Sequence, residues 1–289
     1  FDDDGAIDEA SVRRLVDFQL RCGAHGLTIL GVMGEAHKLS ESERLRLTDV
    51  VMEQVNGRVP VVVGTSHPGA DIVVSLSRHA EKVRAAAIMV APPFGLTSWS
   101  PALMDYYRHV AQRVNLPIVV QDEPASTGVY MPAATLAQIC DEIPAARYIK
   151  LEEMPTPSKI TQVRRIASRE PVIFGGWGGI FFLEELRRGA VGTMTGFAFT
   201  EALVGIYERF TGGDIRGATD LFYRYLPLIR FEGQPGIGLA IRKEVLNWRG
   251  AISSATMRVP GQRLDSETRQ ELFEMLEHLG VPQGAGVRA

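Results

Sequence analysis

Short runs of Val, Ile and Leu alternate along this chain with longer segments in which apolar residues recur every three or four positions. The short runs have the length of buried β-strands, and the longer segments have the period of amphipathic helices. A strand and a helix recur roughly every 25 to 30 residues, which is the spacing expected of βα units. Since the strands are apolar on both faces, the pattern predicts a parallel sheet covered by helices.

The elements can be placed along the chain. Strands are predicted at residues 26–31, 60–64, 86–91, 117–121, 147–151, 172–175 and 191–195. Helices are predicted at about 8–22, 40–56, 69–84, 99–114, 132–142, 156–168, 179–188 and 199–211. Asp8 is a candidate helix cap, and Ser40 with Glu43 has the form of a capping box. Further helical periodicity lies at about 214–230, 236–248 and 265–279.

This repeat predicts a (β/α)8 TIM barrel with a C-terminal helical extension. Residues 1–5 have the character of a loop that follows a strand, so we expect the first barrel strand to lie upstream of residue 1. We place the barrel in residues 1–212 and the helical region in residues 213–289. A doubly wound open sheet is the alternative, but it requires a glycine-rich phosphate turn after its first strand, which the sequence lacks.

Composition narrows the class of protein. The chain has 289 residues, of which 45% are hydrophobic and 22% charged, as in ordinary globular proteins. A net charge of −3 without runs of like charge gives no reason to expect nucleic acid or a membrane as partner. Cys22 and Cys140 lie in helical segments without metal-ligand spacing. We therefore expect buried thiols, no metal, and a cytoplasmic protein.

In a TIM barrel the chemistry lies at the carboxyl ends of the strands, and Lys150 occupies such an end. The period of two along the strand puts Tyr148, Lys150 and Glu152 on one face, and Glu153 on the other. Burying an ammonium group without a partner is unfavourable, whereas a neutral amine can attack a ketone to form a Schiff base. An ion pair between Lys150 and Glu152 is the alternative interpretation.

Polar groups and glycine turns end the other strands. They are Gly31, Val32, Met33 and Gly34, then Ser66 and His67, Gln121, the glycine turn at residues 175–179, and Thr193 with Thr195. Ser66 and His67 could bind substrate hydroxyls, although His67 could equally be a loop histidine. Thr193 and Thr195 could hold a substrate carboxylate. The glycine turn permits close approach of the backbone to a ligand, or is a flexible turn.

Taken in order, four motifs resemble the dihydrodipicolinate synthase/N-acetylneuraminate lyase family of class I aldolases. They are Gly-x-x-Gly-Glu at 31–35, Pro-x-x-Thr-Gly at 124–128, Ile-Lys at 149–150 and Gly-Ala-x-Gly at 189–192. The resemblance covers essentially the whole chain. It implies a barrel with a C-terminal helical domain, usually assembled as a homotetramer. It also implies a Schiff base between Lys150 and a small 2-keto acid, and we expect no cofactor.

The chain departs from the family at several of these positions. Val32 and Met33 replace two threonines, so the backbone N–H groups of residues 31–34 are left to hold the substrate carboxylate as an anion nest. Phe94 replaces a relay tyrosine that a neighbouring subunit supplies, and Ser126 replaces a carboxylate-binding arginine. Gln121 replaces the proton-shuttling tyrosine, and an amide is neither acid nor base near neutral pH.

Glu152 is therefore the candidate proton carrier, the alternative being that it only balances the charge of Lys150. Gln121 together with Ile-Lys-Leu-Glu-Glu at 149–153 resembles the 2-keto-3-deoxy-sugar-acid dehydratases of this family. This implies a hydro-lyase of pentose catabolism, acting on a substrate such as L-2-keto-3-deoxyarabonate to give 2,5-dioxopentanoate. A 2-keto-3-deoxy acid aldolase that releases pyruvate is one alternative, and a non-catalytic 2-keto-acid-binding protein is another.

Overall fold

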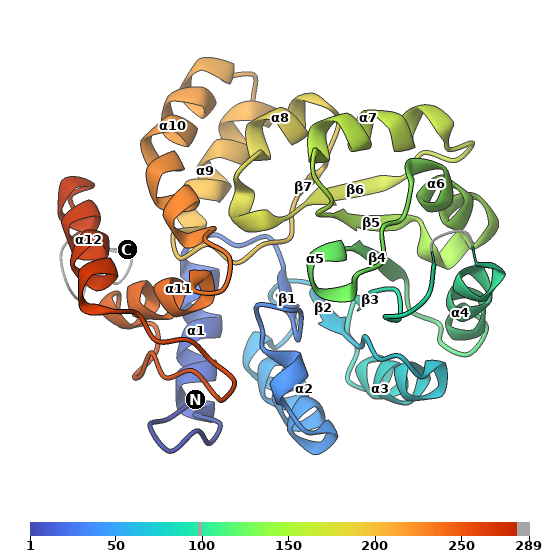
Figure 1. The fold of residues 1–289 in the computed structure, drawn as a ribbon, viewed down its shortest axis with the longest axis horizontal. Coiled ribbons are helices and arrows are strands. Elements are labelled where there is room, and N and C mark those ends of the chain that lie inside the picture. The colour runs from blue at the N-terminus through green and yellow to red at the C-terminus, as the bar shows by residue number, and fades with distance from the viewer. Residues whose placement is uncertain (98–99, 282–289) are drawn as a thin grey trace.

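A curled sheet of seven parallel strands forms the centre of the computed structural model, which describes residues 1–97 and 100–281. The strands are β1 (Leu27–Ile29), β2 (Val61–Gly64), β3 (Ala87–Val90), β4 (Ile118–Asp122), β5 (Tyr148–Leu151), β6 (Val172–Gly175) and β7 (Gly192–Thr193). Each strand pairs with its neighbours in sequence, and helices surround the sheet (Figure 1). This is the TIM-barrel architecture that the alternation predicts. The doubly wound alternative is wrong, because the strand order does not reverse.

Strands β1 and β7 are the edges of this sheet, and no further strand joins them within the described residues. A closed barrel of this type has eight strands, so one strand would fit between these two edges. Its position upstream of residue 1 stays a prediction.

The helices that periodicity predicts begin and end within a few residues of their predicted bounds. They are α1 (Glu9–Arg21), α2 (Glu41–Val55), α3 (Ala70–Lys82), α4 (Pro101–Ala111), α6 (Ala133–Glu142), α7 (Thr156–Ile166), α8 (Phe182–Arg187), α9 (Thr200–Thr211), α10 (Ile215–Glu232), α11 (Gly238–Trp248) and α12 (Ser266–His278). Both predicted caps are confirmed: Asp8 accepts from the N–H of Ser11, and Ser40 and Glu43 form a capping box. Residue 99 of the predicted helix 99–114, and residues 282–289 of the predicted helical region, lie outside the described residues.

Some short elements are not predicted by helical periodicity. They are α5 (Pro124–Thr127) and the 3-10 turns η1 (Ala36–Lys38), η2 (Pro144–Ala146) and η3 (Trp177–Gly179). The eighth helix also begins three residues later than the predicted 179–188, since Trp177, Gly178 and Gly179 adopt positive φ angles of 48°, 67° and 84°. Such angles end regular right-handed helix.

Hydrophobic side chains fill three regions. The outer faces of the strands pack against helices through residues such as Val63, Val120 and Ile149. The inner face of the sheet carries a smaller cluster that includes Met89, Tyr148 and Met194. Lys150 and Glu152 continue the inner face beyond Tyr148, because side chains alternate along a strand.

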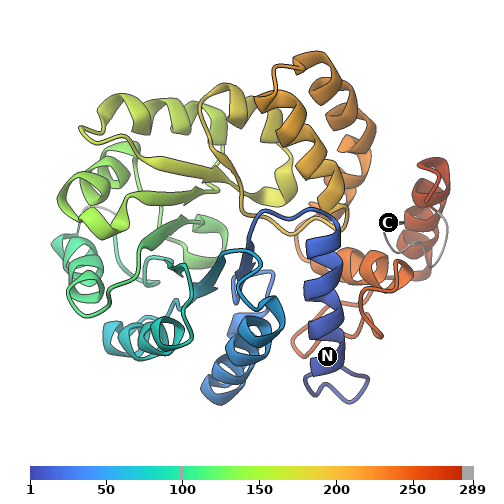
Figure 2. The same ribbon diagram turned by 180° about the vertical axis from the view of Figure 1, so that it is seen from behind.

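A third cluster joins α1 and α8 to the C-terminal helices, with Phe18, Phe182 and Phe222 among its buried residues. Seen from behind, α1 lies between α2 and the C-terminal helices (Figure 2). Because this cluster contains residues from both sides of position 212, the boundary between the ranges 1–212 and 213–289 stays a prediction. Cys22 and Cys140 are free and buried, as expected. No helix in the described part of the chain is both long and apolar enough to cross a membrane.

Candidate active site

Lys150, Glu152 and Gln121 meet at the carboxyl ends of β4 and β5. Gln121 is the register neighbour of Lys150. Nζ of Lys150 lies 3.1 Å from Oε2 of Glu152, and the side-chain amide of Gln121 donates to the same oxygen at 3.1 Å. Lys150 and Glu152 are each 9% exposed, and Gln121 is 2% exposed. The predicted common face of Lys150 and Glu152 is therefore confirmed. The amine of Lys150 and the amide of Gln121 both approach one oxygen of the Glu152 carboxylate.

Glu153 faces the opposite way, towards a helix. Its carboxylate pairs with Lys159 of α7, and Nζ of Lys159 also lies 2.6 Å from Oδ2 of Asp122 at the end of β4. Burial raises the pKa of Asp122 to about 6, although Lys159 opposes this shift. This cluster connects β4, β5 and α7 behind the site. Of the two adjacent carboxylates, Glu152 is the one beside Lys150.

The glycine turn after β6 approaches Glu152. The indole N–H of Trp177 donates to the backbone oxygen of Glu152 at 2.6 Å, and the Trp177 backbone N–H points to Oε1 at 3.5 Å. A Cβ atom at Gly176 would lie 2.5 Å from the same Oε1, closer than any real contact allows. The absence of a side chain at Gly176 therefore leaves room for the Glu152 side chain. Sequence reasoning missed Trp177, whose only signal is that it interrupts a run of glycines.

The turn after β1 is closed by its own hydrogen bonds. The Gly34 N–H donates to the Gly31 oxygen at 3.1 Å, and the Glu35 N–H donates to the Val32 oxygen at 3.0 Å. The Gly34 amide is therefore not a free donor, which corrects the expectation of a nest built from all four residues. The amides of Val32 and Met33 have no hydrogen-bond partner among the described residues, and their side chains are partly exposed. A carboxylate could be held by these two amides.

Glu35 was not singled out from the sequence as a site residue. It is buried, has a φ of 55°, and pairs with Lys38 at 2.9 Å and with Lys243 of α11 at 2.5 Å. Burial alone would raise the pKa of Glu35, but hydrogen bonds from the two lysines outweigh it and lower the pKa. Through Glu35, the turn that carries Val32 and Met33 is fixed to the C-terminal helices.

Three other predicted site residues, Ser66, His67 and Thr195, accept hydrogen bonds from backbone N–H groups of the loops around the barrel. Ser66 Oγ accepts from the Ala91 N–H at 2.9 Å, and His67 Nδ1 accepts from the Gly69 N–H at 3.0 Å. The hydroxyl of Thr195 accepts from the Gly178 N–H at 2.7 Å, so it supports the glycine turn.

Thr193 has a buried hydroxyl without a partner in the described part of the chain. Its neighbour Met194 belongs to the inner cluster, so Thr193 lies on the outer side of β7, away from Lys150. The predicted substrate contacts of Ser66, His67, Thr193 and Thr195 stay predictions.

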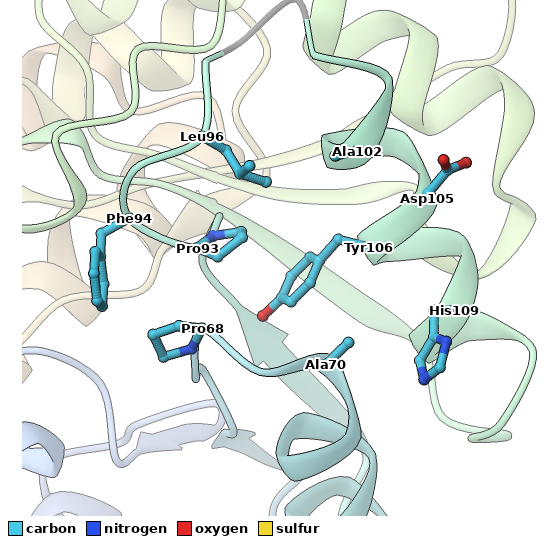
Figure 3. Close-up of a pocket in the computed structure, with 9 residues that line it drawn as sticks. All are labelled: Pro68, Ala70, Pro93, Phe94, Leu96, Ala102, Asp105, Tyr106 and His109. Atoms are coloured by element: carbon cyan, nitrogen blue, oxygen red, sulfur yellow. The ribbon is translucent and has the colours of Figure 1, made fainter.

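A pocket of about 360 Å³ is lined by none of the three central side chains of this site. It is formed by the loops after β2 and β3 together with α3 and α4, with Tyr106 between Pro93 and His109 (Figure 3). Phe94, at its edge, is 69% exposed. Within residues 1–97 and 100–281, no group of His, Cys, Asp and Glu side chains is arranged to hold a metal ion.

Comparison with known proteins identifies the family. Residues 1–279 match the dihydrodipicolinate synthetase family. The chain belongs to this family. L-2-keto-3-deoxyarabonate dehydratase from Azospirillum brasilense is 34% identical over 96% of this chain and 91% of its own length. 4-Hydroxy-tetrahydrodipicolinate synthase from Syntrophobacter fumaroxidans is 28% identical over 96% of this chain and 94% of its own.

Solved structures agree with this placement in the dihydrodipicolinate synthetase family. The crystal structure of dihydrodipicolinate synthase from Rhodopseudomonas palustris matches with a TM-score of 0.90 and 35% identity, covering 96% of this chain and 93% of that chain. The sequence resemblance to the family is therefore confirmed. Family members are lyases, and membership supports class I aldolase-type chemistry for this chain.

Proposed function

We propose that this chain is a Schiff-base hydro-lyase that dehydrates a 2-keto-3-deoxy sugar acid, with L-2-keto-3-deoxyarabonate as substrate and 2,5-dioxopentanoate as product. The observation that carries the proposal is the carboxylate of Glu152, 3.1 Å from Nζ of Lys150, with Gln121 at the position of the family's tyrosine. The dehydratase from Azospirillum brasilense, at 34% identity, supports the choice of reaction.

The reaction begins when the neutral amine of Lys150 attacks C2 of the keto acid and water leaves, forming a protonated imine. The imine acidifies the C3–H bond, and Glu152 takes that proton to give an enamine. The enamine expels the C4 hydroxyl, which leaves as water after receiving a proton from Glu152 or from a water that Glu152 orients. Tautomerisation through C5 gives the aldehyde, and hydrolysis releases Lys150. No carbon–carbon bond breaks, so an aldolase's tyrosine is not required.

In this scheme, Gln121 positions the carboxylate of Glu152. Its amide donates to Oε2 of Glu152, the same oxygen that lies beside Lys150. An amide is neither an acid nor a base near neutral pH, so it orients the carboxylate without competing for the substrate proton. The ion pair between Lys150 and Glu152 is compatible with catalysis. In this scheme it is the resting state of the site, in which the base Glu152 lies beside the nucleophile Lys150.

Borohydride trapping tests the Schiff base. Pyruvate and sodium borohydride should add a lactyl-sized mass to the peptide that contains Lys150. Lys150→Arg should fold but take no label, because a guanidinium group stays protonated and does not attack carbonyl carbon. Lys82→Arg, which changes an exposed lysine of α3, is the matched control and should label normally. Labelling of a different lysine would overturn the mechanism, and the absence of any label would favour a non-catalytic binding protein.

Product analysis on 2-keto-3-deoxypentonate tests the reaction itself. The dehydratase should form 2,5-dioxopentanoate without pyruvate. Stoichiometric release of pyruvate would make the protein an aldolase, the second candidate, which is supported by its synthase relatives. A homotetrameric assembly and a cytoplasmic location belong to the same proposal. The first is supported by the family resemblance and the second by two buried free thiols.

A further inference from the structure

A second carboxyl group, that of Glu185 in α8, is buried behind the site. Glu185 is 1% exposed. Its Oε1 accepts from the hydroxyl of Thr156, the first residue of α7, at 2.6 Å. Its Oε2 is buried without a hydrogen-bond partner among the described residues. Burying a carboxyl oxygen without a partner is unfavourable for folding, so Glu185 is a candidate for a functional role.

Two consecutive glycines make room for two carboxyl groups. A Cβ atom at Gly175 would lie 1.8 Å from Oε2 of Glu185, and a Cβ atom at Gly176 would lie 2.5 Å from Oε1 of Glu152. Because neighbouring residues of an extended chain face opposite sides, Glu185 packs on the helix side of this backbone and Glu152 on the barrel side. Glycine at both positions is what allows this arrangement.

Glu185 also contacts the segment of chain that carries Glu152. Thr156, its hydrogen-bond donor, lies four residues after Glu152. Glu185 therefore touches both the β5–α7 connection, through Thr156, and the end of β6, through Gly175. Trp177, two residues after Gly175, donates to the backbone of Glu152. Glu185 thus connects the two segments that fix the position of Glu152.

We propose that Glu185 is a positioning residue that holds the Glu152 carboxylate beside Lys150 as long as Glu185 remains uncharged. The proposal rests on the proposed function, since it assumes that Glu152 transfers the proton. It makes no use of the identity of the sugar acid, so it applies to any 2-keto acid that forms the Schiff base.

The groups around Glu185 favour the uncharged form. Thr156 of α7 donates to it, Gly175 of β6 offers no side chain, and the nearby charges are those of Glu152 and of Glu184 in its own helix. No ion pair joins it to a cation in the described part of the chain. Burial raises the pKa of Glu185 to about 7; the hydrogen bond from Thr156 opposes this shift, and the two glutamates add to it.

Loss of the Glu185 proton should therefore disturb Glu152. A buried charge without a partner would repel the Glu152 carboxylate and loosen the packing at Gly175. We expect the rate of C3 deuterium exchange on bound pyruvate to fall by about tenfold between pH 7 and pH 8.5, as expected when one ionisation removes the active form.

The test compares the pH profiles of this exchange in three proteins. Glu185→Gln keeps the shape of the side chain and an oxygen that accepts from Thr156, but it does not titrate, so the fall above pH 7 should disappear. Glu184→Gln, the adjacent carboxyl group, is the matched control and should keep the fall, moved slightly to lower pH because the charge of Glu184 adds to the raised pKa of Glu185. Borohydride trapping on Lys150 should be equal in all three. An unchanged profile in Glu185→Gln would overturn the proposal.

Thr156→Val is a second variant, in case Glu185→Gln does not fold. It removes the hydrogen bond that lowers the pKa of Glu185, so the fall in rate should move to higher pH. A fall that stays in place would again contradict the positioning role. Failure of the proposed function would be distinguishable in the unmodified protein: a protein that forms no Schiff base would not trap pyruvate, and an aldolase would release pyruvate from 2-keto-3-deoxypentonate, whatever the pH profile of Glu185→Gln.

Discussion

Glu152 is the residue on which the choice between dehydratase and aldolase depends. Glu152→Gln keeps the size of the side chain but removes the base, and general acid–base groups contribute about 10²- to 10⁴-fold. We expect turnover and C3 exchange to fall by that factor, while borohydride with pyruvate still labels Lys150 because imine formation can use water. Glu153→Gln is the matched control, since Glu153 pairs with Lys159 on the helix side. Normal C3 exchange in Glu152→Gln would remove Glu152 from the mechanism.

At the same scale, the sequence predicts some contacts well and others not at all. The period of two along β5 is local, so it places Lys150 and Glu152 on one face and Glu153 on the other, as found. The contacts of Trp177 with Glu152 join residues from two different strand ends. No local pattern encodes such a contact, because it depends on how neighbouring βα units meet in space.

At the scale of single elements, the glycine turn after β6 is expected to act through Glu152. Gly176→Ala would place a methyl group 2.5 Å from Oε1 of Glu152, so the carboxylate must move away. We expect C3 exchange to fall by about 10²-fold, the lower range of losing an acid–base group. Gly178→Ala is the control: its Cβ would meet open space, but its φ of 67° is unfavourable for alanine. It should lose about 1 kcal/mol of stability and retain most of the exchange.

The turn after β1 gives a second pair of variants. Met33→Ala leaves the backbone amide in place, so it should change the affinity for pyruvate only modestly. Gly34→Val should be far worse, because a Cβ atom at Gly34 would lie 3.0 Å from the backbone nitrogen of Leu30 and distort the turn. Calorimetric titration with pyruvate would measure both affinities. If Met33→Ala abolished binding and Gly34→Val did not, recognition by the Val32 and Met33 amides would be wrong.

The elements differ in how far their sequences specify them. The long helices and the apolar strands follow from periodicity, which needs several turns or residues to be visible. Short elements such as α5 and the turn at Trp177 depend on positive φ angles and on single hydrogen bonds instead. The Gly34 N–H shows the same limit, because its hydrogen bond within the turn could not be foreseen from a pair of glycines.

At the scale of the whole molecule, an ion pair joins a C-terminal helix to the turn after β1. Lys243 of α11 pairs with Glu35 at the end of the turn after β1, and the two are far apart in sequence. The sequence predicts the helical region itself but not this contact, since charge pairs between distant segments leave no periodic signal. The helical region therefore contacts the residue that follows the turn after β1, whatever its boundary with the barrel.

Folding stability and the site are also linked through Glu185. Its pKa rises from 4.5 to about 7 on folding, so the folded chain holds a proton that the unfolded chain has lost. Stability falls with pH wherever the folded state binds more protons, so this group lowers stability progressively from about pH 4.5 to pH 7 and no further above it. The full difference corresponds to roughly 3 kcal/mol.

Glu185→Gln should therefore gain stability relative to the unmodified protein as pH rises. We expect urea denaturation to show a larger free energy of unfolding for the variant at pH 8 than at pH 5, each compared with the unmodified protein at the same pH. Glu184→Gln is again the control and should show little change between the two pH values. A stability difference that is equal at pH 5 and pH 8 would mean that Glu185 is ionised in the folded protein, and the fall in C3 exchange above pH 7 would then need another cause.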